Sequence, residues 1–201
     1  MLCRSFLLLF VFFQFFSHFL AAGEAQEALY IRRLAALKEK GENSLFEQQA
    51  VSFIQEHPHS GYLPYVRLMM AEEALDCARE KEAFGLFSQL MDSPLKEKAI
   101  NGKLLIWRKN GQWTEIEKAL EQYKHLISKN LKESLYFEAA VFYLEDKQKA
   151  LKLLTRASRL KGDLQFEINI LLTAVYDQLG HSEQAYAFFF SYVKKDRKSV
   201  V

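Results

Sequence analysis

One feature constrains the fold of this chain more than any other: an alanine, replaced once by isoleucine, recurs about every 34 residues. These anchors are separated by 33, 33, 34 and 35 residues and stand at Ala50, Ala83, Ile116, Ala150 and Ala185. Four residues after each anchor the chain always has a large apolar residue: Ile54, Phe87, Leu120, Leu154 and Phe189. A period of this length is typical of stacked helix-turn-helix units.

The stretches around the anchors show helical periodicity and are separated by Gly, Pro, Asn or Asp. The predicted helices are 24–40, 45–56, 64–75, 81–91, 95–109, 113–128, 131–144, 147–160, 164–179 and 182–195, with Asn43 or Ser44 capping the second. A lone helical hairpin cannot bury its apolar faces, whereas stacked hairpins share one core. We therefore predict an all-α, right-handed α-solenoid of about five hairpins. A generic helical bundle is the alternative, but it does not explain the regular spacing.

The first 23 residues are typical of an export signal. They combine one basic residue, Arg4, with a run rich in Phe and Leu and a small-residue exit at Ala21-Ala22-Gly23. The alternative is an uncleaved inner-membrane anchor over residues 6–22, which is at the lower edge of a membrane-spanning length. We predict a signal peptide at 1–23, a repeat domain at 24–201 and a periplasmic location, with membrane contact only if the signal stays attached.

Removing this segment leaves a nearly neutral chain with one cysteine. Arg4 leaves with the signal, so 26 basic residues remain against 25 acidic ones. No basic face suited to nucleic acid is therefore expected. Cys77 has no partner for an internal disulfide, and its place in a helix beside Leu75 and Ala78 predicts a buried or half-buried apolar side chain.

The segment from Leu172 to Tyr192 indicates a repeat family. Tyr176, Gly180, Ala185 and Phe189 stand where a tetratricopeptide repeat has its aromatic residue, turn glycine, small crossing residue and packing residue. The chain resembles a tetratricopeptide-repeat protein over almost its whole length after residue 23.

The resemblance is weaker in the first and fourth units, where Lys38 and Glu138 replace the usual small or apolar residue twelve positions before the anchor. We expect the fourth unit to shift by one residue, with Ala139 and Phe142 facing inward and a shorter turn.

A second resemblance concerns location. The stretch from Phe53 to Tyr62, FIQEHPHSGY, is similar to a repeat boundary in exported tetratricopeptide proteins of the bacterial envelope, such as the TolA-binding type and the lipoprotein of the outer-membrane assembly machine. His57 replaces the usual Tyr, and Glu24 stands where a lipoprotein would have its cysteine. The resemblance implies a groove, lined by the first helix of each pair, that binds a peptide or helix of a protein partner.

Motifs for other chemistry are missing from the sequence. His57 and His59 alone fall short of a zinc site, and Glu72, Glu73 and Asp76 fit a solvated helix face better than an acid–base pair. The glycines are scattered singly, so no phosphate-binding loop is formed. We expect no enzyme activity, catalytic residue, metal or cofactor, and no nucleic-acid partner.

The family's groove positions can be placed on the first helices of three units. They fall on Tyr65, Leu68, Glu72, Lys98, Asn101, Leu105, Arg108, Lys132 and Leu135. A basic and polar centre beside Tyr65 and Leu68 predicts an acidic peptide or a C-terminal carboxylate as the ligand, since charge-assisted contacts orient such groups. A plain solvated face is an equally good interpretation of these positions. The leading hypothesis is a non-enzymatic interaction scaffold in the cell envelope.

The last predicted helix carries two apolar rows. Ala185, Phe188, Phe189 and Tyr192 are predicted to face the core, and Tyr186, Phe190 and Val193 form a second row beside them. This second row either widens the core packing or forms an exposed interaction patch. In the latter case the chain is a structural subunit that self-associates as a homo-oligomer or caps a larger assembly. A helical protein that binds a solute or lipid is a weaker third hypothesis.

Overall fold

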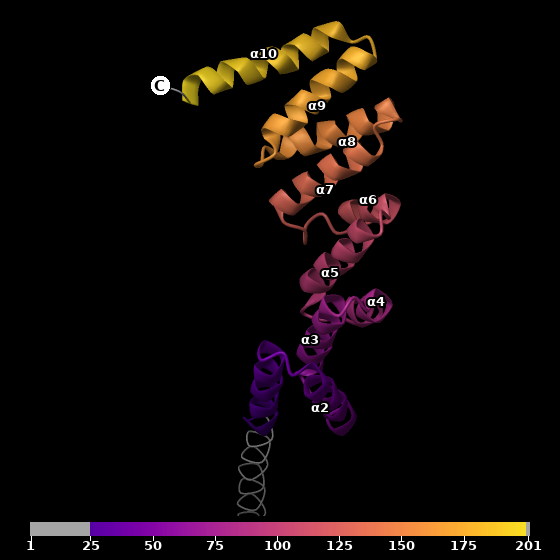
Figure 1. The fold of residues 1–201 in the computed structure, drawn as a ribbon, viewed down its shortest axis with the longest axis vertical. Coiled ribbons are helices and arrows are strands. Elements are labelled where there is room, and N and C mark those ends of the chain that lie inside the picture. Colours follow the sequence, from indigo (N-terminus) through magenta and orange to yellow (C-terminus); the bar gives the residue numbers. More distant parts are fainter. Residues whose placement is uncertain (1–24, 200–201) are drawn as a thin grey trace, which may run out of the picture. The chain divides into compact units, whose positions relative to one another are not determined.

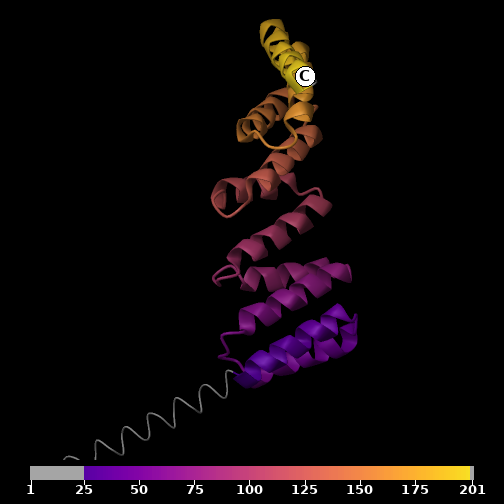
Figure 2. The ribbon, with the colours of Figure 1, turned by 90° about the vertical axis from the view of Figure 1, so that its left-hand side faces the viewer.

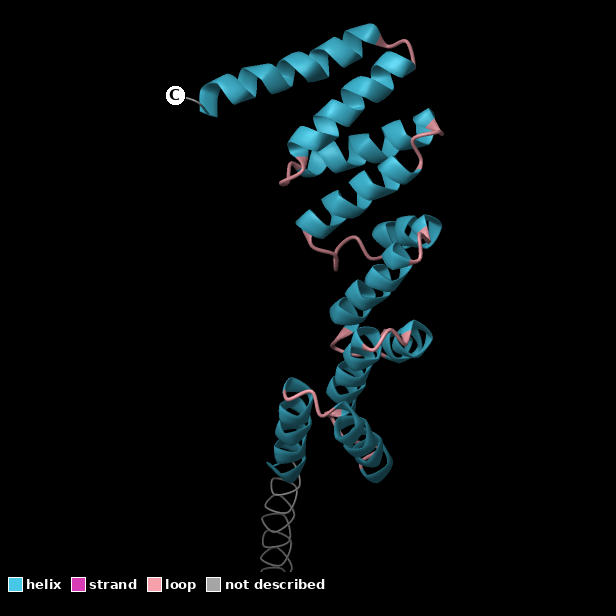
Figure 3. Cartoon of the chain, viewed as in Figure 1, coloured by secondary structure: helices cyan, strands magenta, loops and turns pink. Residues whose placement is uncertain are grey.

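The computed structural model describes the backbone of residues 25–199 and the side chains of residues 25–190. This part of the chain forms ten helices and contains no strand (Figures 1 and 3). They are a helix at 25–39, α2 (Asn43–Glu56), α3 (Leu63–Asp76), α4 (Glu80–Gln89), α5 (Lys96–Lys109), α6 (Trp113–Gln122), α7 (Lys129–Phe142), α8 (Lys147–Leu160), α9 (Gln165–Gln178) and α10 (Ser182–Ser199). The predicted all-α class and consecutive hairpins are confirmed. The predicted signal peptide lies outside the described residues.

The chain divides into two compact units, and the division falls within the residues of α5. The first unit ends at Lys103 and contains the helix at 25–39, α2, α3, α4 and the start of α5, which Figure 2 shows in indigo to magenta. The second unit begins at Leu104 and contains the end of α5 and helices α6 to α10. Within each unit, successive helices pack against one another, as α3 does on α4 and α9 on both α8 and α10.

All five anchors are buried, as the period predicts, with at most 6 % of their surface exposed. The large residues four positions later follow the prediction at Phe87, Leu120 and Leu154, which are nearly fully buried, and Ile54 is half-buried. Phe189 was predicted to face the core, and this prediction is wrong because half of its surface is exposed. The reason is that α9 packs on α8, the helix that carries Leu154, whereas no described helix follows α10.

Four of the hairpin turns share one backbone motif. In each turn a residue with positive φ ends the helix, and the next residue's N–H bonds to the carbonyl five positions back. Gly41, Gly111 and Gly180 occupy this left-handed position with φ of 72°, 65° and 77°, which glycine adopts without steric cost. Ala78 occupies the same position in the α3–α4 turn with φ of 59°. That turn therefore carries steric strain that the glycine turns avoid.

Three local predictions are wrong. Helix α6 ends at Gln122 rather than at 128, and Ile127 fills the core from the following loop. Neither Asn43 nor Ser44 caps α2, because the helix begins two residues earlier than expected and the Asn43 amide lies 3.8 Å from the Cys77 sulfur. Cys77 is exposed rather than buried, since it follows the last helical residue of α3 at the surface.

The α7–α8 turn differs from the prediction of a shorter turn. It spans four residues, 143–146, where the other hairpin turns span three, and Asp146 caps α8 by accepting a 3.0 Å bond from the N–H of Lys149. Ala139 is buried as predicted, but Phe142 is 58 % exposed. The extra turn residue changes the register of α7 relative to its anchor. As a result, the Phe142 ring stays at the surface, where it packs against Trp113 and Tyr143.

Two close contacts define how successive hairpins meet. Between α4 and α5, a methyl group on Gly102 would collide with the ring of Phe87, so glycine permits this approach. Between α7 and the turn before α9, the buried Glu133 carboxylate accepts bonds from the N–H groups of Gly162 (2.8 Å) and Leu164 (3.2 Å). A buried carboxylate needs such partners, and here it satisfies N–H groups at the start of α9.

Candidate interaction surfaces

The first unit carries five of the predicted groove residues. Tyr65 and Lys98 are exposed, and Glu72 and Asn101 are half-buried. Glu72 is already engaged, because the Lys38 ammonium donates a 2.9 Å bond to its carboxylate. Leu68 is only 5 % exposed, so its predicted place on a surface is wrong. It belongs to the apolar side of α3, which packs against α2 and α4.

The second unit carries the other four. Leu105 is 53 % exposed, while Leu135 is buried at 1 % and contributes to the core rather than to a surface. The register change in α7 explains this error. Arg108 is exposed and forms a two-point ion pair with Glu138, with both N···O distances at 2.6 Å. The Lys132 ammonium donates to the Lys124 carbonyl at 2.9 Å.

These contacts change the electrostatics expected of the groove positions. Arg108 is neutralised by Glu138, and Lys132 is held by a backbone carbonyl. Lys98 is an exposed cation on α5. One turn further along the same helix, the Asn101 Oδ1 is shielded from solvent and accepts no hydrogen bond within the described structure. Residues three apart share a helix face, so the exposed Lys98 cation and the shielded Asn101 amide lie on the same side of α5.

Sequence reasoning missed five exposed apolar side chains on first helices: Leu29 on the helix at 25–39, Val141 and Phe142 on α7, and Phe166 and Ile170 on α9. Ile170 could have been found, because it stands fifteen residues before its anchor, as Asn101 and Leu135 do before theirs. The two α7 residues depend on the longer α7–α8 turn, which no residue pattern signalled.

The last hairpin exposes an apolar surface. Tyr186, Phe189 and Phe190 on α10 are 64, 50 and 58 % exposed, and we call them the α10 patch. Beside it, a hollow of about 250 Å³ lies between α9 and α10, lined by Phe166, Asn169, Ile170, Thr173, Phe188 and Phe189. Tyr186 and Phe190 therefore do not widen the core packing. The third residue of the predicted row, Val193, has its side chain outside the described part.

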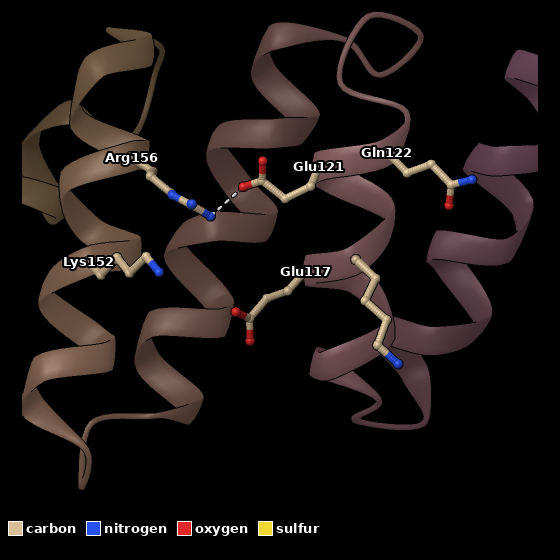
Figure 4. A pocket seen from close by; sticks show the side chains of 6 residues that line it. Glu117, Glu121, Gln122, Lys152 and Arg156 are labelled. Carbon is tan, nitrogen blue, oxygen red and sulfur yellow. Dashed lines mark ion pairs between the residues drawn. The ribbon is translucent and has the colours of Figure 1, made fainter.

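A charged cleft of about 630 Å³ opens between α6 and α8 (Figure 4). Its lining residues are Glu117, Lys118, Glu121, Gln122, Lys152 and Arg156. Arg156 pairs with Glu121 at 2.6 Å, and Lys149 reaches Glu117 at 3.0 Å. Burial, with a smaller contribution from Glu121, raises the pKa of the nearby Tyr136 phenol above its usual value. The two carboxylates are held in ion pairs between helices, which is an arrangement that connects hairpins.

The described residues contain no cluster of three or more His, Cys, Asp or Glu side chains placed to hold a metal ion. Within the same residues, none of the helices has the length and apolar character needed to cross a membrane.

Comparison with known proteins gives similarity at the level of structure. No protein-family model matches the chain, and no curated protein matches it in sequence. Among solved structures, MamA from Desulfovibrio magneticus RS-1 is similar with a TM-score of 0.55 and 14 % identity, over 85 % of this chain and 94 % of that one. A double mutant of MamA RS-1 has a TM-score of 0.57 at 14 % identity, over 85 % and 94 %. MamA AMB-1 has a TM-score of 0.55 at 15 % identity, over 86 % and 92 %. At this identity the matches establish the fold: the chain is a tetratricopeptide-like helical-repeat protein.

Proposed function

We propose that this chain is a non-enzymatic scaffold that binds a segment of a protein partner along the exposed side of its first helices. The observation that carries the proposal is the pairing, on one face of α5, of the exposed Lys98 cation with the unsatisfied Asn101 Oδ1. A buried acceptor without a donor is costly unless something supplies one. A backbone N–H of a bound peptide would supply that donor once the side chains that cover the Asn101 amide move aside.

The partner's chemistry follows from the charges that remain unpaired. Lys98 suits a carboxylate, either an acidic side chain or a chain end. Arg108 is already paired with Glu138 and so offers no free charge. The ligand proposed is therefore an extended peptide with one acidic group near Lys98. This is a more specific ligand than the acidic peptide expected from the sequence.

The proposed location is the bacterial periplasm. Its support is the order of basic end, apolar run and small-residue exit in residues 1–23. Retention at the inner membrane through residues 6–22 is the alternative. Osmotic release of the chain from intact cells supports export, and recovery with the membrane fraction favours the anchor.

The groove is tested by reversing charge on the first helices. The full chain carrying Lys98→Glu and Arg108→Glu is compared with a control carrying Lys152→Glu and Arg159→Glu on α8, which has the same change in net charge. A partner captured from an envelope extract is purified, and its affinity is measured by calorimetry at physiological salt. We expect at least a tenfold loss for the groove variant, which corresponds to about 1.4 kcal/mol, and little change for the control. Equal affinity for both variants rules out the groove.

A further inference from the structure

Five residues of α10 form a row whose residue types are nearly symmetric about Phe190. Around Phe190, Tyr186 stands four residues before and Val193 three residues after, while Glu183 and Arg197 stand seven residues away on either side. All five positions fall within the single helix Ser182–Ser199. Spacings of three, four and seven place them along one side of a helix. The row therefore has an apolar centre, one acidic end and one basic end.

The charges around α10 are also divided between its two ends, with acidic residues near its start and basic residues near its end. Around the start of α10 lie the exposed Glu183 and, at the end of α9, the exposed Asp177. The other end of α10 has the sequence Lys-Lys-Asp-Arg-Lys at positions 194–198, with four basic residues against one acidic residue. Two such helices that run antiparallel bring each acidic end to the other's basic end. Two parallel helices would bring like charges together.

We propose that α10 pairs with α10 of a second copy in antiparallel orientation, about a two-fold axis that passes close to Phe190. In this arrangement position 183 of each copy lies opposite position 197 of the other, position 186 lies opposite position 193, and Phe190 lies opposite its own equivalent. A two-fold interface requires a self-complementary surface of this kind. The occupant of the α10 patch is thus a second copy of this chain.

The apolar area is larger than the row itself. The rings of Phe189 and Phe190 meet edge to face at a centroid distance of 5.7 Å, and Phe189 lines the hollow between α9 and α10. Phe166 and Ile170 on α9 extend this exposed surface. A second copy centred on Phe190 would cover the inner part of the α10 patch and reach the rim of the hollow. Shielding such a continuous apolar area is the main driving force of association.

The pairing is independent of the proposed groove, because it uses α10 and its neighbour α9, whereas the groove test alters α5. The groove variant Lys98→Glu/Arg108→Glu is expected to keep the same oligomeric state as the parent. Failure of either idea therefore leaves the other standing.

The first test measures the mass of the full chain by light scattering across a dilution series. We expect a dimer for the parent and a monomer for Phe190→Glu, with unchanged helical circular dichroism because Phe190 is exposed. Leu105→Glu is the matched control, since Leu105 is similarly exposed on α5, and it should remain dimeric. A monomeric parent at high concentration overturns the proposal. The proposal is also overturned if the parent is monomeric and binds a different protein, and if Phe190→Glu abolishes that binding. The α10 patch would then bind that protein rather than a second copy.

A charge swap tests the antiparallel register. Glu183→Arg and Arg197→Glu should each weaken the dimer by about tenfold, because each creates two like-charge pairs at the rim. The double variant restores opposite charges and should recover affinity to within about threefold of the parent. If the double variant instead loses as much affinity as the two single variants together, the antiparallel register is wrong.

A cross-linking experiment locates the axis. In a background with Cys3 and Cys77 changed to Ala, Phe190→Cys should form a disulfide-linked dimer on its own. Glu183→Cys and Arg197→Cys should cross-link only when the two variants are mixed. Efficient self-cross-linking of Glu183→Cys would indicate parallel helices and overturn the proposal.

Discussion

Phe87 and Phe189 occupy the same repeat position, four residues after their anchors, and yet they have opposite environments. Phe87 is 2 % exposed because it packs onto Gly102 at the start of the next hairpin. Phe189 is 50 % exposed because no described helix follows α10. The repeat pattern therefore specifies which side of the helix carries the large side chain. Whether that side chain is buried depends on the helix that packs against it.

The largest expected effect compares these two rings directly. Phe87→Ala should lower the free energy of unfolding by about 3–5 kcal/mol, because it removes a buried ring and leaves a cavity. Phe189→Ala should change it by less than about 0.5 kcal/mol, as at other surface sites. Urea unfolding followed by circular dichroism measures both, at a dilution where the chain is monomeric. Equal losses would break the comparison.

A smaller effect is expected at the surface that receives Phe87. Gly102→Ala should cost about 1–3 kcal/mol, since the added methyl group collides with the ring and forces the hairpins apart. Gly85→Ala is the matched control, because this helical glycine of α4 has open space around it. That variant should gain up to about 1 kcal/mol from helix propensity. A loss at Gly85 similar to that at Gly102 would show that the Phe87 contact is not the cause.

The smallest expected effect on stability concerns the hairpin turns, whose strain is local. The turn residues Ala78 and Gly180 share a positive φ, one inside the array of described hairpins and one in the last hairpin. Ala78→Gly should raise stability by about 0.5–1 kcal/mol, and Gly180→Ala should lower it by about 1 kcal/mol. These turns need no neighbouring hairpin, so position in the chain should not matter. Thermal unfolding checks both, and an Ala78→Gly variant less stable than the parent would refute the strain at this turn.

This contrast also explains what the sequence could predict. The anchors could be predicted because each is buried within its own hairpin. Every hairpin needs a buried residue at this position, so the residue recurs with the period of the repeat. Leu68 and Leu135 were misplaced because family register was applied to helices whose burial depends on both neighbours. In α7 the four-residue turn also changed that register, and the sequence Glu145-Asp146 gave no sign of its length.

The end of α6 shows a different limit. Tyr123 and Ile127 continue the helical spacing of Ile116 and Leu120, so periodicity predicted one helix through 128. Ile127 is buried all the same, but from a loop, and Ser128 then caps α7 by accepting a bond from the N–H of Leu131. Apolar spacing reports which residues are buried, and a loop can deliver a side chain to the same place as a helix.

The site was less predictable than the fold. The exposure of Tyr186 and Phe190 was among the predicted alternatives, whereas the pairing of Arg108 with Glu138 was not, because the two residues lie thirty positions apart. Likewise, the open acceptor on Asn101 follows only from the three-dimensional surroundings of its side chain.

The contacts at the start of α7 have a consequence for how this chain tolerates changes in length. Glu133, Lys129 and Asn130 all bond to the four-residue linker 161–164, at Gly162 and Leu164, Lys161 and Asp163 respectively. An inserted residue there would part a buried carboxylate from its two N–H donors. In the six-residue linker 123–128, the Lys132 ammonium of α7 bonds to the Lys124 carbonyl, and neither of these residues is buried. Insertions, tags and natural length variants are therefore expected to accumulate between α6 and α7 and to be excluded between α8 and α9.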